Sequence, residues 1–287
     1  MPASLQALLA QPCASDVRLV EVGWGGRADF VQARIPGACY IDTSEIERPP
    51  LWNRIADDEL LAVLLANGIR HDTTVVVYGR APLPPARLAH LLLYAGVQDV
   101  RWLDGGFAAW QRAGLPVEEG ACAAGQPAMD FGARFPARPD YMVDIAEAAQ
   151  LLRSGEGTLV SIRSRAEFTG ETSGYGVLAA RSDIPGALWG RAGRDGDAHC
   201  MREYLQGDGT FRPLADIAAF WREEGIGAQQ RIAFYCGTGW RASLAFLVAW
   251  LLGWPRIGVY EGGWLEWSGA HLVTAGDEAP AVACMAG

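Results

Sequence analysis

Ile232-Ala-Phe-Tyr-Cys-Gly-Thr-Gly-Trp-Arg241 is the stretch that decides the fold, because it leads from a buried strand through a glycine-rich loop into a helix. The continuous apolar run Ile232–Tyr235 is typical of a strand buried on both faces of a parallel sheet. The following segment, Ala242–Leu252, is apolar on nearly all sides, which indicates a helix in the core. Strand, tight loop and helix in this order predict an α/β fold.

Working outward from this stretch, the chain repeats itself. Three pairs of segments share one offset of 157 residues: Gly68-Ile69 and Gly225-Ile226, Val75–Tyr78 and Ile232–Tyr235, Asp104–Trp110 and Glu261–Trp267. Two further pairs have smaller offsets: Ile35–Ala38 and Ile184–Ala187 at 149, Leu19–Val22 and Leu159–Ile162 at 140. We call the two halves copy one and copy two. Copy two is the longer, and its extra residues fall before Gly225.

Each copy alternates short apolar runs with helical stretches, which predicts two tandem domains, each a mostly parallel sheet flanked by helices. The expected strands are Leu19–Val22, Val75–Tyr78, Val100–Leu103, Leu159–Ile162, Ile232–Tyr235 and Ile257–Tyr260. The expected helices are Asp57–Asn67, Arg87–Tyr94, Ile217–Glu224 and Ala242–Leu252. Little periodicity between the copies indicates a linker. The expected division is therefore 1–120, a linker at 121–139, and 140–287.

Composition excludes several classes of function. The net charge of −9 and the pI near 5.0 argue against a nucleic-acid partner. The six cysteines contain no C-x-x-C pair and the four histidines have no ligand-like spacing, so we expect neither a disulfide framework nor a metal, and no cofactor. The N-terminus lacks a charged signal-peptide region, and the longest apolar run, Leu244–Trp254, is too short to span a membrane. We therefore expect a cytoplasmic protein.

Cys236 lies where open α/β sheets place their ligands, between the end of a strand and the start of a helix. The free N–H groups and positive dipole end of that helix would stabilise a thiolate. Gly237 and Gly239 let successive backbone amides turn inward as an anion cradle. Arg241 would add a positive charge at the edge of the cradle. The loop therefore predicts a reactive thiol that needs no separate general base.

Four motifs of copy two together resemble the rhodanese family, in particular tandem-domain sulfurtransferases that use thiosulfate or 3-mercaptopyruvate. They are Arg163-Ser-Arg-Ala-Glu-Phe168, Ile184-Pro-Gly-Ala187, the loop Cys236–Arg241 and Gly262-Gly-Trp-Leu-Glu-Trp267. The similarity covers about residues 15 to 270. It implies that Cys236 carries sulfur as a persulfide between a small anionic donor and a thiophilic acceptor.

The resemblance also implies which residues form the site. Cys236 and Arg241 are expected to be catalytic, and the residues expected to bind substrate are Gly237, Thr238, Gly239, Trp240, Arg181, Tyr175 and Arg191. Copy one is expected to be inactive, since the 157-residue offset places Gly79 opposite Cys236 and Pro84 opposite Arg241. Proline has no N–H with which to complete a cradle. Arg80, in the same inactive loop, is a candidate to face the cleft between the domains.

The bland interpretation of several of these residues stays open. Arg191 and Arg194 could instead cap a surface loop, Tyr175 could be a structural tyrosine, and Trp240 could belong to the core. The sequence also departs from the family at two positions, with Ser161 where aspartate is usual and Asp183 where histidine is usual. The small residues after Cys236 resemble the mercaptopyruvate type while Trp240-Arg241 does not, so the donor stays open.

Two other functions compete with a sulfurtransferase. Cysteine phosphatases share a related loop, but they place arginine six residues after the cysteine, whereas Arg241 is five after and Ala242 is the sixth. The shorter loop suits a single sulfur better than a tetrahedral phosphate. The second alternative is a non-catalytic persulfide carrier that delivers sulfur to an acceptor protein.

Overall fold

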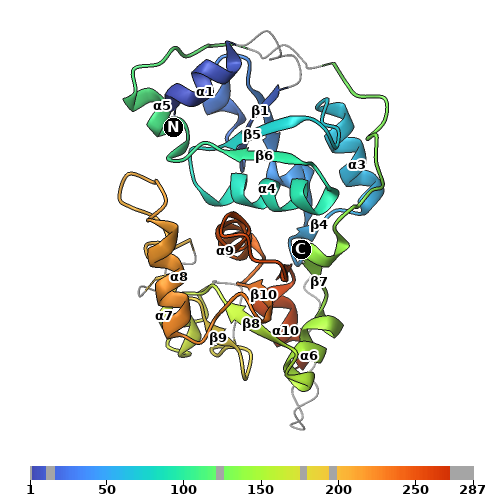
Figure 1. Ribbon diagram of the computed structural model, residues 1–287, viewed down its shortest axis with the longest axis vertical. Coiled ribbons are helices and arrows are strands. Elements are labelled where there is room, and N and C mark those ends of the chain that lie inside the picture. The colour runs from blue at the N-terminus through green and yellow to red at the C-terminus, as the bar shows by residue number, and fades with distance from the viewer. Residues whose placement is uncertain (1, 11–16, 121–125, 175–179, 194–198, 272–287) are drawn as a thin grey trace, which may run out of the picture.

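The computed structural model describes residues 2–10, 17–120, 126–174, 180–193 and 199–271. Two α/β domains lie one above the other along the long axis, copy one above copy two in the view of Figure 1. The predicted fold class is confirmed: each domain has a parallel sheet flanked by helices.

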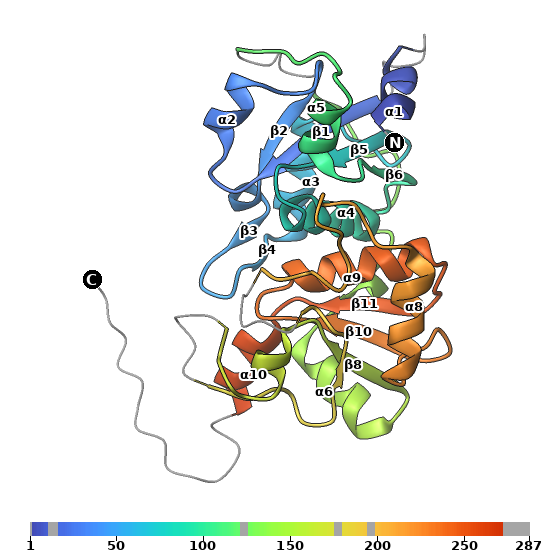
Figure 2. The same cartoon turned by 90° about the vertical axis from the view of Figure 1, so that its left-hand side faces the viewer.

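Copy one is built on a four-stranded parallel sheet with the strand order β2-β1-β5-β6. Its elements are α1 (Pro2–Leu9), β1 (Val17–Gly23), α2 (Arg27–Gln32), β2 (Cys39–Asp42), η2 (Thr43–Glu45), β3 (Glu47–Arg48), β4 (Asn53–Arg54), α3 (Asp57–Ala66), β5 (Thr74–Tyr78), α4 (Leu83–Ala95), β6 (Asp99–Trp102) and α5 (Gly106–Arg112). The short β3 and β4 pair separately as an antiparallel hairpin. That hairpin reaches down toward copy two (Figure 2).

Copy two is built on a five-stranded parallel sheet with the strand order β7-β11-β10-β8-β9. Its elements are η3 (Pro139–Tyr141), β7 (Met142–Val143), α6 (Ile145–Ser154), β8 (Gly157–Ser161), α7 (Arg165–Phe168), β9 (Leu188–Trp189), α8 (Leu214–Glu223), β10 (Arg231–Tyr235), α9 (Trp240–Leu251), β11 (Ile257–Tyr260) and α10 (Gly263–His271). The central strand β10 is buried along all but its first residue, as its apolar run predicts.

The six expected strands are all present, with boundaries within two residues of those expected. The largest difference in a helix is α4, which begins at Leu83 and not at Arg87. Pro84 and Pro85 occupy its first turn, where no intrahelical N–H bond is needed, so proline does not interrupt the helix. The two prolines therefore lie inside the first turn of α4, whereas the expected helix began after them, at Arg87.

The domains meet through the same helix of each copy. Helices α4 and α9 begin 157 residues apart in the sequence and pack on each other between the two sheets (Figures 1 and 2). All of α4 is buried, and so is α9 from Arg241 to Ala249. Each helix covers its own sheet on one side and the other copy on the opposite side, which explains why α9 is apolar nearly all round.

His90 on α4 is fully buried in this interface. Its ring lies 4.6 Å from the ring of Phe246 on α9, and its Nε2 lies 3.0 Å from the carbonyl oxygen of Tyr141. Burial, reinforced by the nearby charge of Arg87, lowers the pKa of His90 to about 3. The histidine is therefore neutral and acts as a packing residue.

Residues 126–138, which precede copy two, run along copy one and are hydrogen-bonded to it. The amide of Ala128 donates to the carbonyl of Leu65 at 2.8 Å, and the amide of Ala137 donates to that of Ala95 at 3.0 Å. The first strand of copy two, β7, begins at Met142. The domain limits given above stay a prediction.

Two features are not found in the described part of the chain. None of its helices is long and apolar enough to cross a membrane. No group of three or more His, Cys, Asp or Glu side chains within it is placed to hold a metal ion.

Candidate active site

Cys236 follows directly after β10, and its side chain is fully buried. Gly239, with φ +96°, ends the loop and is the N-cap of α9. A positive φ is costly for any residue with a side chain, so glycine is needed here. In this conformation the amide of Gly239 donates to Sγ of Cys236 at 3.2 Å. This hydrogen bond is the one that an amide cradle for a thiolate or persulfide requires.

The other side of the loop is held by α10. The amide of Trp264 donates to the carbonyl of Cys236 at 2.8 Å, and the amide of Leu265 donates to that of Gly237 at 3.2 Å. These bonds require Gly263, because a Cβ there would lie 2.5 Å from the Cys236 carbonyl oxygen. The loop Cys236–Arg241, which we call the sulfur loop because it begins with the Cys236 thiol, is therefore tied to the Gly-Gly turn that follows β11.

Copy one repeats this geometry without the cysteine. The amide of Phe107 donates to the carbonyl of Gly79 at 3.1 Å, just as Trp264, 157 residues later, does to Cys236. A Cβ on Gly79 would lie 2.8 Å from the carbonyl oxygens of Val22 and Ala81. The backbone at Gly79 therefore leaves no room for a cysteine, which agrees with an inactive copy one.

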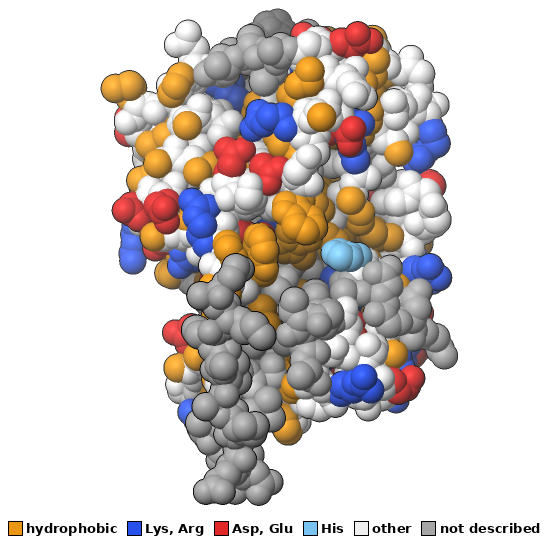
Figure 3. Space-filling view, turned by 180° about the vertical axis from the view of Figure 1, so that it is seen from behind, with side chains coloured by type: hydrophobic (Ala, Val, Ile, Leu, Met, Phe, Trp, Pro, Cys, Tyr) orange, Lys and Arg blue, Asp and Glu red, His pale blue; other side chains and the backbone are white. Residues whose placement is uncertain are grey.

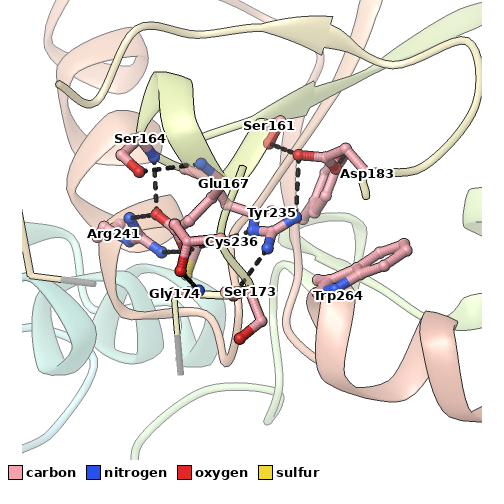
Figure 4. Close-up of polar contacts among 12 residues, drawn as sticks. Ser161, Ser164, Glu167, Ser173, Gly174, Asp183, Tyr235, Cys236, Arg241 and Trp264 are labelled. Atoms are coloured by element: carbon pink, nitrogen blue, oxygen red, sulfur yellow. Dashed lines mark hydrogen bonds and ion pairs between the residues drawn. The ribbon is translucent and has the colours of Figure 1, made fainter. Parts of the chain in front are cut away.

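Arg241 is buried, and its guanidinium makes two hydrogen bonds to the Glu167 carboxylate, at 2.7 and 2.9 Å. A carboxylate of matching geometry compensates the charge of a buried guanidinium. Arg241 therefore anchors the first turn of α9 and positions the loop through Glu167 (Figure 4). The expected catalytic role of Arg241 stays a prediction.

Glu167 is a residue whose role the sequence analysis missed, although it lies in the Arg163–Phe168 motif. Its carboxylate also accepts the amide of Ser164 at 2.8 Å, completing a capping box at α7, and lies 3.4 Å from Nε of Arg163. Burial alone would raise the pKa of Glu167, but the hydrogen bonds and charge of Arg241 outweigh it and lower that pKa below its ordinary value. The group is therefore an ionised link between α7 and α9.

Arg163 fixes both ends of the inserted segment of copy two. It is fully buried and donates to the carbonyl of Ser173 at 3.0 Å and to that of Ser182 at 2.7 Å. Its guanidinium also lies over the ring of Trp264, 5.2 Å from the centroid. The backbone at Ser173 and Ser182 is thus held by the same arginine that lies over Trp264 (Figure 4).

The two departures from the family pattern are partners in the structure. Ser161 Oγ donates to Asp183 Oδ2 at 2.8 Å, and Tyr235 OH donates to the other oxygen of the same carboxylate. Burial raises the pKa of Asp183, while the charge of Arg163, 3.1 Å away, opposes the rise. In this chain the carboxylate thus stands at position 183 and not at position 161, and its partner at position 161 is a hydroxyl.

The other expected substrate residues differ in placement. Arg181 is exposed and follows Ala180, whose carbonyl accepts Nε1 of Trp264 at 3.3 Å, so Arg181 lies beside the support of the loop. Arg191 pairs with Glu223 at 3.0 Å and with Glu224 at 2.7 Å, at the C-terminal end of α8. Those carboxylates compensate its charge, and its role in donor binding stays a prediction. Tyr175 and Arg194 lie outside the described residues.

Trp240 and Thr238 occupy the outer part of the loop. Thr238 is half-buried, and the Trp240 ring packs edge-on against Trp24 of copy one, with 6.1 Å between centroids. Trp240 also borders a pocket of about 410 Å³ between the copies, which Arg80 lines from copy one and His199 from copy two. Trp24 is 62% exposed, and hydrophobic side chains gather in the middle of the face shown in Figure 3. Trp240 therefore can present an apolar wall to a small molecule, and Arg80 faces this pocket.

Gly239→Ala tests the geometry of the cradle. We expect the free energy of unfolding to fall by about 1–2 kcal/mol, because alanine is strained at a positive φ. We also expect at least about tenfold slower alkylation of Cys236 by iodoacetamide, because the amide of residue 239 turns away from Sγ. Gly253→Ala is the matched control: it has φ +74° at the other end of α9, with no atom within 4 Å of its added Cβ. Equal alkylation rates in both variants would show that the 239 amide does not stabilise the sulfur.

Comparisons with known proteins agree with this geometry. A family model described as "Rhodanese-like domain" matches residues 1–113 and 144–270. "Thiosulfate sulfurtransferase YnjE" of Escherichia coli K12 is 47% identical over 93% of this chain and 61% of its own length, and a crystal structure of YnjE superimposes with a TM-score of 0.88. "Sulfur carrier protein TtuD" of Thermus thermophilus is 30% identical over 81% of each chain.

A further solved structure is that of an anaerobic ergothioneine biosynthesis enzyme from Chlorobium limicola in complex with its substrate trimethyl histidine. It is 39% identical with a TM-score of 0.83, over 88% of this chain and 62% of that one. The present chain thus spans about three fifths of the length of YnjE and of the ergothioneine enzyme.

Proposed function

Because the chain belongs to the rhodanese-like domain family, we propose that it is a sulfurtransferase that carries sulfur as a persulfide on Cys236. The observation that carries the proposal is the buried Cys236 thiol, which accepts the amide of Gly239 at the carboxyl end of the central strand. Copy one has Gly79 at that position, so the chain has one sulfur site. The reaction suits the cytoplasm, where thiols stay reduced.

The chemistry proceeds in two displacements. The Cys236 thiolate attacks the outer sulfur of a small anionic donor; with thiosulfate, the donor's S–S bond breaks and sulfite leaves with the electron pair. With 3-mercaptopyruvate, the C–S bond breaks and pyruvate leaves after its enolate takes a proton. A thiophilic acceptor, such as a thiol or cyanide, then attacks the outer sulfur of the persulfide and restores the thiolate. Ping-pong kinetics follow from this order.

This chain's own residues have three tasks in that sequence. The Gly239 amide stabilises the anionic sulfur before and after loading, in a site that excludes water. Arg181, exposed next to the loop support, is the proposed contact for the anionic group of the donor. Tyr175 is proposed as a proton donor to a pyruvate leaving group.

Donor loading tests the proposal directly. The purified chain is incubated with thiosulfate and, separately, with 3-mercaptopyruvate, and intact mass is measured without reductant. We expect the mass of one sulfur atom to be gained with at least one donor and to be removed by dithiothreitol. The donor that loads sulfur faster then identifies the class of substrate. No gain with either donor would overturn the proposal.

A sulfur carrier is the second candidate, favoured by the match to "Sulfur carrier protein TtuD". In that case the persulfide forms once and leaves only to a partner protein. Steady turnover with cyanide as acceptor supports the enzyme. Loading that stops after one sulfur per chain, with no release to cyanide or small thiols, supports the carrier.

A further inference from the structure

Arg87 belongs to the inactive copy but lies against the sulfur loop of copy two. It is on α4, its side chain is fully buried, and no reaction step described above uses it. A buried guanidinium is costly unless carboxylates compensate its charge. Two carboxylates do so, one from each copy: Glu47 also contacts Trp240, and Glu261 directly precedes the Gly-Gly turn that supports the loop.

The carboxylate from copy one is Glu47, on the β3–β4 hairpin that reaches toward copy two. Its Oε1 accepts Nε of Arg87 at 2.7 Å, and its Oε2 accepts Nε1 of Trp240 at 2.7 Å. Burial raises the pKa of Glu47, while the charge of Arg87 and the hydrogen bond from Trp240 oppose the rise. Arg87 therefore holds, through Glu47, the residue with which α9 begins.

The carboxylate from copy two is Glu261. Its Oε2 accepts Nη2 of Arg87 at 2.6 Å and the amide of Arg54 at 3.0 Å. Glu261 directly precedes Gly262-Gly263, the turn from which α10 sends its amides to the carbonyls of Cys236 and Gly237. Arg87 therefore also holds the support on the other side of the loop.

The third nitrogen of Arg87 faces the loop itself. Nη1 is buried, has no hydrogen-bond acceptor among the described residues, and would lie 3.5 Å from a Cβ placed on Gly239. Gly239 is the residue whose amide is bonded to Sγ of Cys236. One guanidinium thus reaches, directly or through one carboxylate, Trp240, the Gly-Gly turn and Gly239.

We propose that Arg87 is a positioning residue with which the inactive copy holds the sulfur loop in its thiolate-binding conformation. The inference rests on the proposed function of Cys236. The planar fork of arginine fits this task because it bridges two carboxylates in fixed directions, whereas the ammonium of lysine is a compact point charge. Without the guanidinium of Arg87, Trp240 and the Gly-Gly turn are no longer held in place. The amide of Gly239 then moves away from Sγ of Cys236.

Arg87→Lys is the test, made in the whole chain and measured by two readouts. The first is the pH dependence of Cys236 alkylation by iodoacetamide, which needs no donor; the second is the rate of sulfur loading from thiosulfate, followed by intact mass. We expect the alkylation midpoint to move to higher pH and loading to slow about tenfold to a hundredfold, as expected for a misplaced cradle.

Arg34→Lys is the matched control. Arg34 is equally buried in copy one, where it pairs with Glu118 and the Gly120 carbonyl, so its loss destabilises the domain without touching Arg87, Glu47 or Glu261. We expect Arg34→Lys to lower the melting temperature and to leave both readouts at wild-type values. If Arg87→Lys also only lowers the melting temperature, Arg87 is merely interface packing and the inference is overturned.

Glu47→Gln keeps the test decisive if Arg87→Lys does not fold, because the amide still accepts one hydrogen bond and Arg87 keeps Glu261. The same shift in alkylation is expected, to a smaller extent, and an unchanged profile would overturn the inference. The proposed function fails in a different way: the wild-type chain itself then takes up no sulfur. A shifted alkylation profile with no loading would leave the role of Arg87 intact and reject sulfur transfer.

Discussion

Cys236→Ser is expected to abolish sulfur loading from every donor, at least about a thousandfold below the wild type. A serine hydroxyl stays protonated near neutral pH and forms no bond to sulfane sulfur under these conditions. The fold should survive, because the change is nearly isosteric in a fully buried position and the Gly239 amide can donate to Oγ in place of Sγ. The measurement is intact mass after donor incubation, together with a thermal melt.

Two other cysteines provide the controls for this result. Cys39 is half-buried and its thiol donates to the carbonyl of Leu19, while Cys200 is buried and its thiol donates to that of Ala192. Cys39→Ser and Cys200→Ser are expected to load one sulfur per chain, like the wild type. If Cys236→Ser still took up sulfur and either Cys39→Ser or Cys200→Ser did not, the sulfur would be carried by that other cysteine.

How much of this fold is readable in the sequence depends on whether local or distant residues decide it. The strand β11 was predicted to the residue, since a four-residue apolar run between turns has few alternatives. The 157-residue offset placed Gly79 opposite Cys236, and the equivalent backbone hydrogen bonds bear out that alignment. The first inference uses a local pattern, and the second uses the internal repeat of the sequence.

The side-chain contacts that hold the sulfur loop in place could not be predicted from the sequence in this way. The pair of Arg241 with Glu167 was not predicted, because Glu167 lies 74 residues earlier in the chain. The available signal was the Arg-x-x-x-Glu spacing at Arg163, which brings two ionisable groups within 3.4 Å of each other across the start of α7. Nothing local indicates that Arg87 meets Glu261, since that contact depends on how α4 and α9 pack between the two domains.

Glu167→Ala is expected to destabilise copy two by about 3–5 kcal/mol, because it removes the carboxylate that two buried arginines contact. Arg241 loses both of its hydrogen bonds to that carboxylate, whereas Arg163 still has Asp183 as an acidic partner. Since Arg241 lies in the first turn of α9, sulfur loading should fall with stability. The measurements are the free energy of unfolding in urea and loading by intact mass.

The pH dependence of this contribution has a definite sign. The folded-state pKa of Glu167 is held below its ordinary value near 4.5. The stabilisation is therefore complete above about pH 4.5, where the unfolded chain is also ionised, and is lost as the pH falls through the folded-state pKa. The difference in unfolding free energy between the wild type and Glu167→Gln should consequently shrink on acidification below pH 4.5. A constant difference across that range would show that the ionised carboxylate contributes nothing.

A double-mutant cycle separates the Glu167–Arg241 pair from the size of the side chains. Glu167→Gln and Arg241→Met each leave one buried charge without its partner, whereas the double variant removes both charges of the pair. We expect the double variant to lose clearly less stability than the sum of the single variants, because the desolvation of the pair is relieved as well as its attraction. Arg163 limits the recovery, since it still faces position 167 at 3.4 Å. Additive losses would mean that the two side chains support α7 and α9 independently, and the ion pair would not be what holds the sulfur loop in place.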